Sequence, residues 1–228
     1  MPFFEDSGVR VEEQRGPLFG AFATLFDQIE RMMALNVAWA LQLVPLLAAL
    51  AYQGLPAWAR VLLILYSVVA LGPATGALFA VIGRACDGEL LRLEMVRESF
   101  RQAIRPSLTT LVPLYSTFVW LTLLAMWAGS RQVLAVNVLA QLAIMLLGVC
   151  AVYWGPLVAA RPEQSALAVL RESVRLAWRA PLLTLFTGVA ALLAFVIGAI
   201  SIGGTFLVVP VLVALLETEQ YRGVMRNS

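Results

Sequence analysis

Six long runs of apolar residues constrain the fold of this chain more than any other feature of its sequence. A helix needs about 20 residues to cross roughly 30 Å of hydrocarbon, and none of the six runs contains Asp, Glu or Arg. The sequence therefore predicts an all-α, polytopic membrane helix bundle with six transmembrane helices. The runs are Met33–Ala51, Val61–Val81, Leu108–Trp127, Val133–Leu157, Leu182–Ile200 and Ile202–Leu216.

Composition supports a membrane protein. Hydrophobic residues make up 61% of the 228-residue chain and charged residues only 13%, whereas a soluble domain averages about 45–50% apolar and about 25% charged residues. We expect one membrane domain, residues 1–228. The last run is short and contains Pro210, so a re-entrant hairpin with five crossings is the alternative there.

The arginines predict the orientation. All 16 basic residues are Arg. If the N-terminus lies inside, 14 of them fall on the cytoplasmic side, and only Arg60 and Arg131 fall outside. Cytoplasmic loops of membrane proteins carry such an excess of basic residues. The distribution predicts that both termini are in the cytoplasm.

Three segments between or before the apolar runs are amphipathic at helical spacing. They are Leu18–Met32, Leu93–Ala103 and Ala166–Ala177. Each directly precedes an apolar run. We expect three cytoplasmic interfacial helices whose apolar faces turn toward lipid or the bundle.

The second and third amphipathic segments are copies of each other. Val96–Leu111 aligns without gaps on Leu170–Leu185, with nine of 16 positions identical. Gly-Pro pairs also occur upstream of both copies. The sequence thus predicts an internal parallel repeat, with units of about 58–128 and 134–202 and an axis along the membrane normal.

The repeat produces two arginine stripes with four-residue spacing, which places each stripe on one helix face. They are candidates for binding anionic lipid headgroups, a phosphorylated ligand or an acidic partner. The alternative is a solvated face that only helps to orient the protein. The arginine stripes are Arg97, Arg101 and Arg105, and Arg171, Arg175 and Arg179.

Four amide side chains are candidates for a polar membrane interior: Asn36, Gln42, Asn137 and Gln141. Hydrogen bonding between helices is one role for them, and lining a pore is the other. Because no charged residue lies inside the runs, the sequence argues against a proton- or sodium-coupled carrier.

The sequence contains no recognisable enzyme motif. It lacks His and Lys, and its two cysteines, Cys86 and Cys150, are predicted to lie at different membrane depths. We therefore expect no catalytic residues, no metal site and no cofactor. The net charge of +2 gives no reason to expect a nucleic-acid partner.

The region Leu18–Arg105 resembles the YesL-like family of bacterial integral membrane proteins, whose function is unknown. The resembling residues are Asn36-x-x-Trp39, the run GPATGALFAV from Gly72 to Val81, and Gly88-Glu89 followed by Phe100. The resemblance implies the bacterial cytoplasmic (inner) membrane and, by gene context, an association with carbohydrate uptake systems. It supplies no site residues.

Two functional hypotheses follow. The first is a non-enzymatic inner-membrane accessory or scaffold protein whose partners are anionic lipid and another membrane complex, such as a sugar uptake system. The alternative is a pathway or transporter for a neutral small solute. A polar cavity lined by the four amides would favour the pathway, and amides paired between helices would favour the accessory protein.

Overall fold

The computed structural model describes residues 28–52, 54–200 and 208–226, and its elements there are all helices. This confirms the all-α class for the described chain. In chain order the helices are α3 (Ile29–Ala40), η1 (Leu41–Leu43), α4 (Val44–Ala51), α5 (Ala57–Cys86), α6 (Leu93–Thr109), α7 (Leu111–Ser130), α8 (Leu134–Ala151), α9 (Trp154–Ala160), α10 (Ala166–Arg179), α11 (Pro181–Ile200) and α13 (Val209–Arg226).

Five stretches of the described chain are long and apolar enough to cross a membrane, which supports a multi-pass membrane protein. They are α3 through α4, then α5, α7, α8 and α11. The sixth predicted run falls partly outside the described residues. Its remainder forms the first half of α13, whose second half carries Glu217, Glu219, Arg222 and Arg226.

Two of the predicted spans are interrupted near a proline, because proline has no N–H to donate to the helical ladder. In the first span, the short 3₁₀ turn η1 precedes Pro45 at the start of α4. The fourth run, Val133–Leu157, was expected to form one helix. Instead α8 ends at Ala151, a turn follows, and α9 begins at Trp154 with Pro156 in its first turn.

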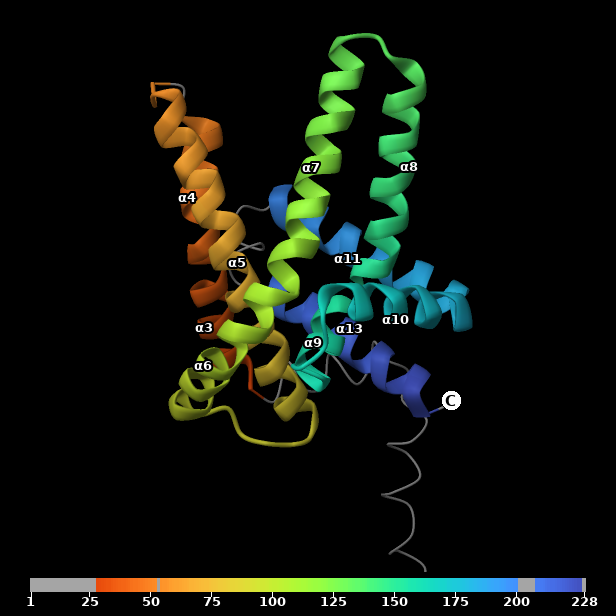
Figure 1. The fold of residues 1–228 in the computed structure, drawn as a ribbon. Coiled ribbons are helices and arrows are strands. Elements are labelled where there is room, and N and C mark those ends of the chain that lie inside the picture. Colours follow the sequence, from red (N-terminus) through yellow and green to blue (C-terminus); the bar gives the residue numbers. More distant parts are fainter. Residues whose placement is uncertain (1–27, 53, 201–207, 227–228) are drawn as a thin grey trace, which may run out of the picture.

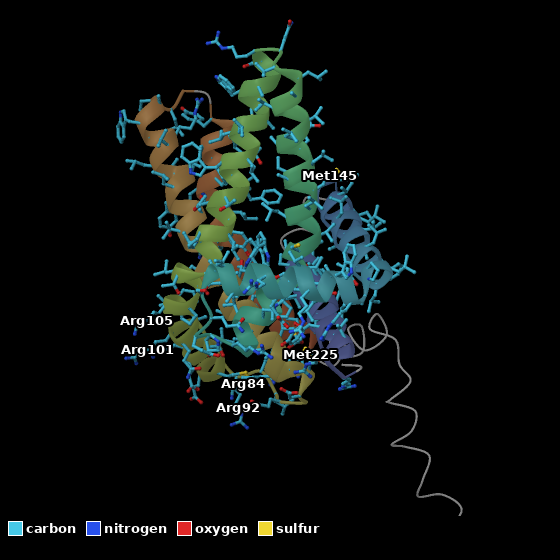
Figure 2. The ribbon with its side chains drawn as sticks, turned by 45° about the vertical axis from the view of Figure 1, so that its right-hand side comes forward. Arg84, Arg92, Arg101, Arg105, Met145 and Met225 are labelled. Carbon is cyan, nitrogen blue, oxygen red and sulfur yellow. The ribbon has the colours of Figure 1, made fainter. Side chains whose placement is uncertain are left out.

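The helices separate into a tall apolar part and an arginine-rich end. α4 packs beside α5, and α7 beside α8, as two upright hairpins, whereas α6, α9 and α10 gather at the opposite end (Figure 1). The labelled side chains of Arg84, Arg92, Arg101 and Arg105 all lie at that opposite end (Figure 2). We call it the arginine-rich end. The second and third amphipathic segments form α6 and α10 there, and most of the first, Leu18–Met32, lies outside the described residues.

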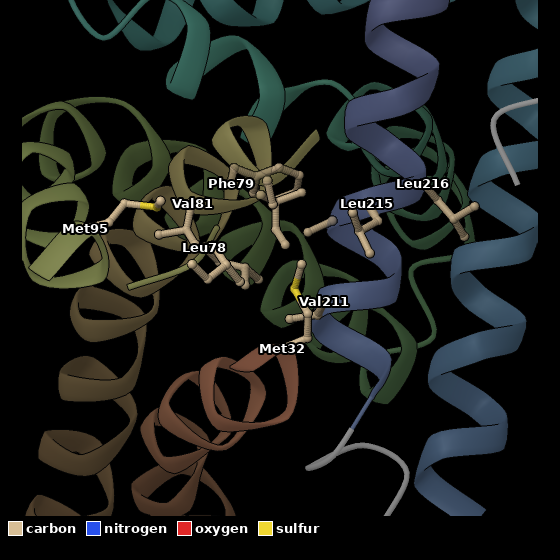
Figure 3. Close-up of a cluster of buried hydrophobic side chains, with 12 residues drawn as sticks. Met32, Leu78, Phe79, Val81, Met95, Val211, Leu215 and Leu216 are labelled. Carbon is tan, nitrogen blue, oxygen red and sulfur yellow. The ribbon is translucent and has the colours of Figure 1, made fainter. Parts of the chain in front are cut away.

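The larger core lies where α13 packs against α3 and α5 (Figure 3). Met32 of α3, Leu78 and Ile82 of α5, and Val211 and Leu215 of α13 are at most 3% exposed. A second buried cluster joins α7, the turn after α8, α9 and α10 around the fully buried Tyr153 and Trp154. Thus α13, which holds the charged tail of the sequence, is built into the bundle.

Two glycines allow close helix contacts that shape the interior. A side chain at Gly76 of α5 would collide with Ser107 of α6. A side chain at Gly155 of α9 would collide with the ring of Phe79. The second contact brings α9 against α5 and fixes the Phe79 ring, which forms part of the wall of the cavities described next.

Candidate functional site

The structure leaves both arginine stripes on the surface. All six side chains are exposed on α6 and α10. Arg175 is 3.6 Å from the Glu172 carboxylate on the same helix. The opposite faces of the two helices pack inward, where Ser99 of α6 and Ser173 of α10 are buried. Both helices therefore pack on the bundle through the face that contains these serines.

A third face of α6 and α10 is apolar and exposed. On α6 it includes Leu93 and Phe100, which are 85% and 45% exposed. On α10 it includes Val174 and Trp178, which are 51% and 86% exposed. Apolar side chains beside a row of arginines are typical of helices that lie at a lipid–water boundary. This arrangement would place the guanidinium groups at the level of the lipid headgroups.

The four candidate amides do not form one site. Asn36 is fully buried, and its Oδ1 accepts a hydrogen bond from the Val211 amide at the start of α13, at 2.7 Å. Gln141 donates to Asn137 within α8, at 3.1 Å. Gln42 is half-buried. None of them lines any of the cavities described below. Only Asn36 therefore pairs between helices as the accessory hypothesis requires.

The structure instead points to a cavity of about 190 Å³ at the centre of the bundle, which we call the central cavity. Residues from α3, α5, α7, the end of α8, α9 and α13 line it, so it lies where most of the core helices meet. Its lining residues are Trp39, Thr75, Leu78, Phe79, Tyr115, Ala151, Trp154, Gly155, Pro210, Val213, Ala214 and Glu217.

Glu217 is the one charged residue in this lining. Its side chain is half-buried, and burial raises its pKa well above the usual value for a glutamate. No salt bridge of the described residues includes it. In the sequence Glu217 directly follows the last apolar run, Ile202–Leu216. The periodicity of α13 could have located it, because Pro210, Val213, Ala214 and Glu217 follow the spacing of one helix face.

Polar groups around the central cavity are few. The Trp39 indole N–H donates to the Thr75 hydroxyl at 3.1 Å. The Trp154 side chain is 2% exposed, and its indole nitrogen has no hydrogen-bond partner among the described residues. The rings of Trp154 and Tyr115 are 6.2 Å apart and tilted by 49°. The cavity thus combines a carboxylate, several aromatic rings and one unpaired donor.

A buried hydrogen-bond network attaches α13 to two neighbours. Gln220 of α13 donates from Nε2 to the Tyr153 hydroxyl at 2.8 Å. That hydroxyl is 2.6 Å from the Thr184 hydroxyl of α11. Because all three side chains are buried, the network holds α13 in register with α11 and with the turn that precedes α9. It thereby fixes the position of Glu217, one turn earlier.

Two further cavities adjoin the central one. A cavity of about 340 Å³ lies at the arginine-rich end, where Arg222 contacts the Asp87 carboxylate at 2.9 Å and the Gly83 carbonyl at 2.7 Å. It shares Phe79 with the central cavity. An apolar cavity of about 380 Å³ shares Tyr115 and Trp154 with the central cavity on its other side. The three cavities therefore form a series with common walls.

Potential metal ligands are scattered among the described residues. No group of three or more His, Cys, Asp or Glu side chains that could hold a metal ion occurs among them. Burial raises the pKa of Tyr221, beside the arginine-rich cavity, and the positive charge of Arg161 partly opposes that rise.

No protein-family profile, curated protein or solved structure matches the chain.

Proposed function

We propose that this chain is a non-enzymatic accessory or scaffold protein of a bacterial inner membrane. The observation that supports the proposal is that α6 and α10 pack on the bundle through one face and leave both arginine stripes exposed. Such surfaces attract anionic lipid headgroups. The resemblance to the YesL-like family implies an association with carbohydrate uptake systems. We therefore propose another membrane complex, such as a sugar uptake system, as the partner.

Anionic lipid is expected to stabilise the folded protein through the arginine stripes. Adding phosphatidylglycerol to the purified protein in neutral detergent at low salt should raise its melting temperature, since each arginine near an anionic surface contributes on the order of 1 kcal/mol. Replacing all six stripe residues with Gln should abolish most of this rise, whereas Arg131→Gln should not. Equal stabilisation of the six-residue variant would contradict the proposed lipid contact.

We further propose six crossings with both termini in the cytoplasm, so that the run 202–216 provides the last one. The 14-to-2 division of the arginines supports this topology, as does the position of Arg84, Arg92, Arg101 and Arg105 at one end (Figure 2). Reporter fusions at Ser228 and in the loop that contains Arg131 should report opposite sides of the membrane. Reporters on the same side would mean an even number of crossings between these two points and would rule out the six-crossing topology.

The internal parallel repeat is also part of the proposal. Residues that align at the offset of 74 have similar environments: Ser99 and Ser173 are buried, as are Thr110 and Thr184. In both units an interfacial helix leads directly into a long apolar helix. The units also differ, because α6 continues through Pro106 to Thr109, whereas α10 ends at Arg179 and Pro181 begins α11.

A pathway for a neutral small solute is the second candidate function. The series of three cavities supports it, because Phe79 lines both the arginine-rich and the central cavity, and Tyr115 and Trp154 line both the central and the apolar cavity. Phe79, at the boundary of the first two, is 5% exposed and packs against Gly155. Flux of a neutral sugar into liposomes that contain only the purified protein would favour this candidate and overturn the accessory proposal.

A further inference from the structure

The central cavity places aromatic rings from four helices around one carboxylate. Trp39 of α3, Phe79 of α5, Tyr115 of α7 and Trp154 of α9 line it together with Glu217 of α13. Neither the proposed accessory function nor the arginine stripes make use of this arrangement. The aromatic residues come from segments far apart in the sequence, so the site exists only in the folded bundle.

The charge of the site selects for a cation. Other carboxylates at the arginine-rich end, such as Asp87 and Glu89, pair with arginines, but the lining of the central cavity contains no basic residue. A carboxylate in a poorly hydrated interior interacts with an opposite charge more strongly than it does in water. A bound cation would therefore offset the cost of keeping Glu217 ionised in this place.

The scarcity of hydrogen-bonding groups narrows the ligand class. Apart from Glu217, the polar lining groups are Thr75, the Tyr115 hydroxyl and two indoles, and the Trp39 indole already donates to Thr75. A sugar would leave many of its hydroxyls without partners, which costs binding energy. An ammonium ion that carries alkyl groups needs few hydrogen bonds and is attracted by the faces of aromatic rings.

We propose that the central cavity binds a small organic cation of the alkylammonium class, with Glu217 as its counter-ion and the surrounding rings as its walls. The cavity volume of about 190 Å³ equals roughly six water molecules at about 30 Å³ each, which suits a compact ligand. The Trp154 ring lines the cavity, and its indole N–H has no hydrogen-bond partner among the described residues. Choline, a quaternary ammonium ion with one hydroxyl, is a suitable probe.

The test compares choline with 3,3-dimethylbutan-1-ol, which has the same shape without the charge. Binding to the purified full-length chain in neutral detergent is followed by calorimetry and by tryptophan fluorescence, since Trp39 and Trp154 line the cavity. Saturable choline binding is expected, with the neutral alcohol at least about tenfold weaker. Equal binding of the two probes, or binding of neither at millimolar concentration, would overturn the proposal.

Variants then assign the binding to the cavity. Glu217→Gln should weaken choline binding at least about tenfold, whereas Glu219→Gln removes the same charge from α13 outside the cavity and should leave binding unchanged. Tyr115→Leu keeps the carboxylate, removes one ring, and should weaken binding severalfold. Each variant is first checked for a monodisperse elution profile. Wild-type affinity in Glu217→Gln, or an equal loss in Glu219→Gln, would exclude the site, and either result leaves the accessory proposal standing.

Discussion

Replacing Asn36 with leucine is expected to destabilise the folded protein by about 1–3 kcal/mol. Pro210 lacks an N–H, and the Leu212 amide donates to the Val208 carbonyl within the chain. The Val211 amide at the start of α13 depends instead on the Asn36 Oδ1, at 2.7 Å. Val211 and Asn36 are both fully buried, so water cannot replace the lost acceptor. Leucine has the same number and branching of side-chain heavy atoms as asparagine, but it cannot accept the hydrogen bond from the Val211 N–H.

Asn137→Leu is the matched control. Asn137 is half-buried on α8, where it accepts a hydrogen bond from the exposed Gln141 of the same helix, and a side chain added at Gly129 of α7 would be 3.7 Å from its Nδ2. We expect this change to be neutral or slightly stabilising, because the hydrogen-bond partner of the Asn137 amide among the described residues lies on the same helix. Melting temperatures of both variants in the same detergent measure the difference. A loss in Asn36→Leu no larger than that in Asn137→Leu would contradict the capping role of Asn36.

The sequence predicted those parts of the fold that depend on local pattern. Run length located five stretches that the structure shows as candidate spans. Helical periodicity located α6 and α10. Each helix packs on the bundle through one face, and the alternation of apolar and polar residues at helical spacing marks that face in the sequence. The division of the fourth run at Val152 and Tyr153 was missed, since a proline in an apolar segment can bend a helix or end it. Packing against the rest of the bundle decides between the two.

The candidate site could not be located in the same way, because six segments of the chain contribute to it. Composition marks Trp39, Tyr115 and Trp154 only as aromatic residues in apolar runs, where they occur widely. Their convergence on one cavity depends on contacts such as Phe79 against Gly155. Asn36 was a candidate from its polarity alone, and its role became clear only with α13 placed against α3. Asn137 and Gln141 were candidates for the same reason, and the structure shows them hydrogen-bonded to each other within α8.

Replacing Glu217 with glutamine is expected to stabilise the protein at neutral pH when no organic cation is present. Burial raises the pKa of Glu217 in the folded state, whereas an unfolded glutamate titrates near 4.3. The folded state therefore binds the proton more tightly, and protonation favours folding. That contribution is fully present below about pH 4 and is lost as the pH rises through the folded-state pKa. Glutamine is uncharged at every pH and shows no such loss.

The melting temperatures of wild type and Glu217→Gln should thus be similar near pH 4 and separate as the pH rises, with the variant higher by on the order of 5 °C. Above the raised pKa the gap should stay constant. Tyr115 is the other titratable residue that lines the cavity, and it is present in both proteins. Sodium phosphate and acetate buffers avoid amine cations, and Glu219→Gln controls for the loss of one charge from α13. A gap that is widest at acid pH would contradict the assignment, because only ionisation of Glu217 in a poorly hydrated cavity makes the wild type less stable as protons leave.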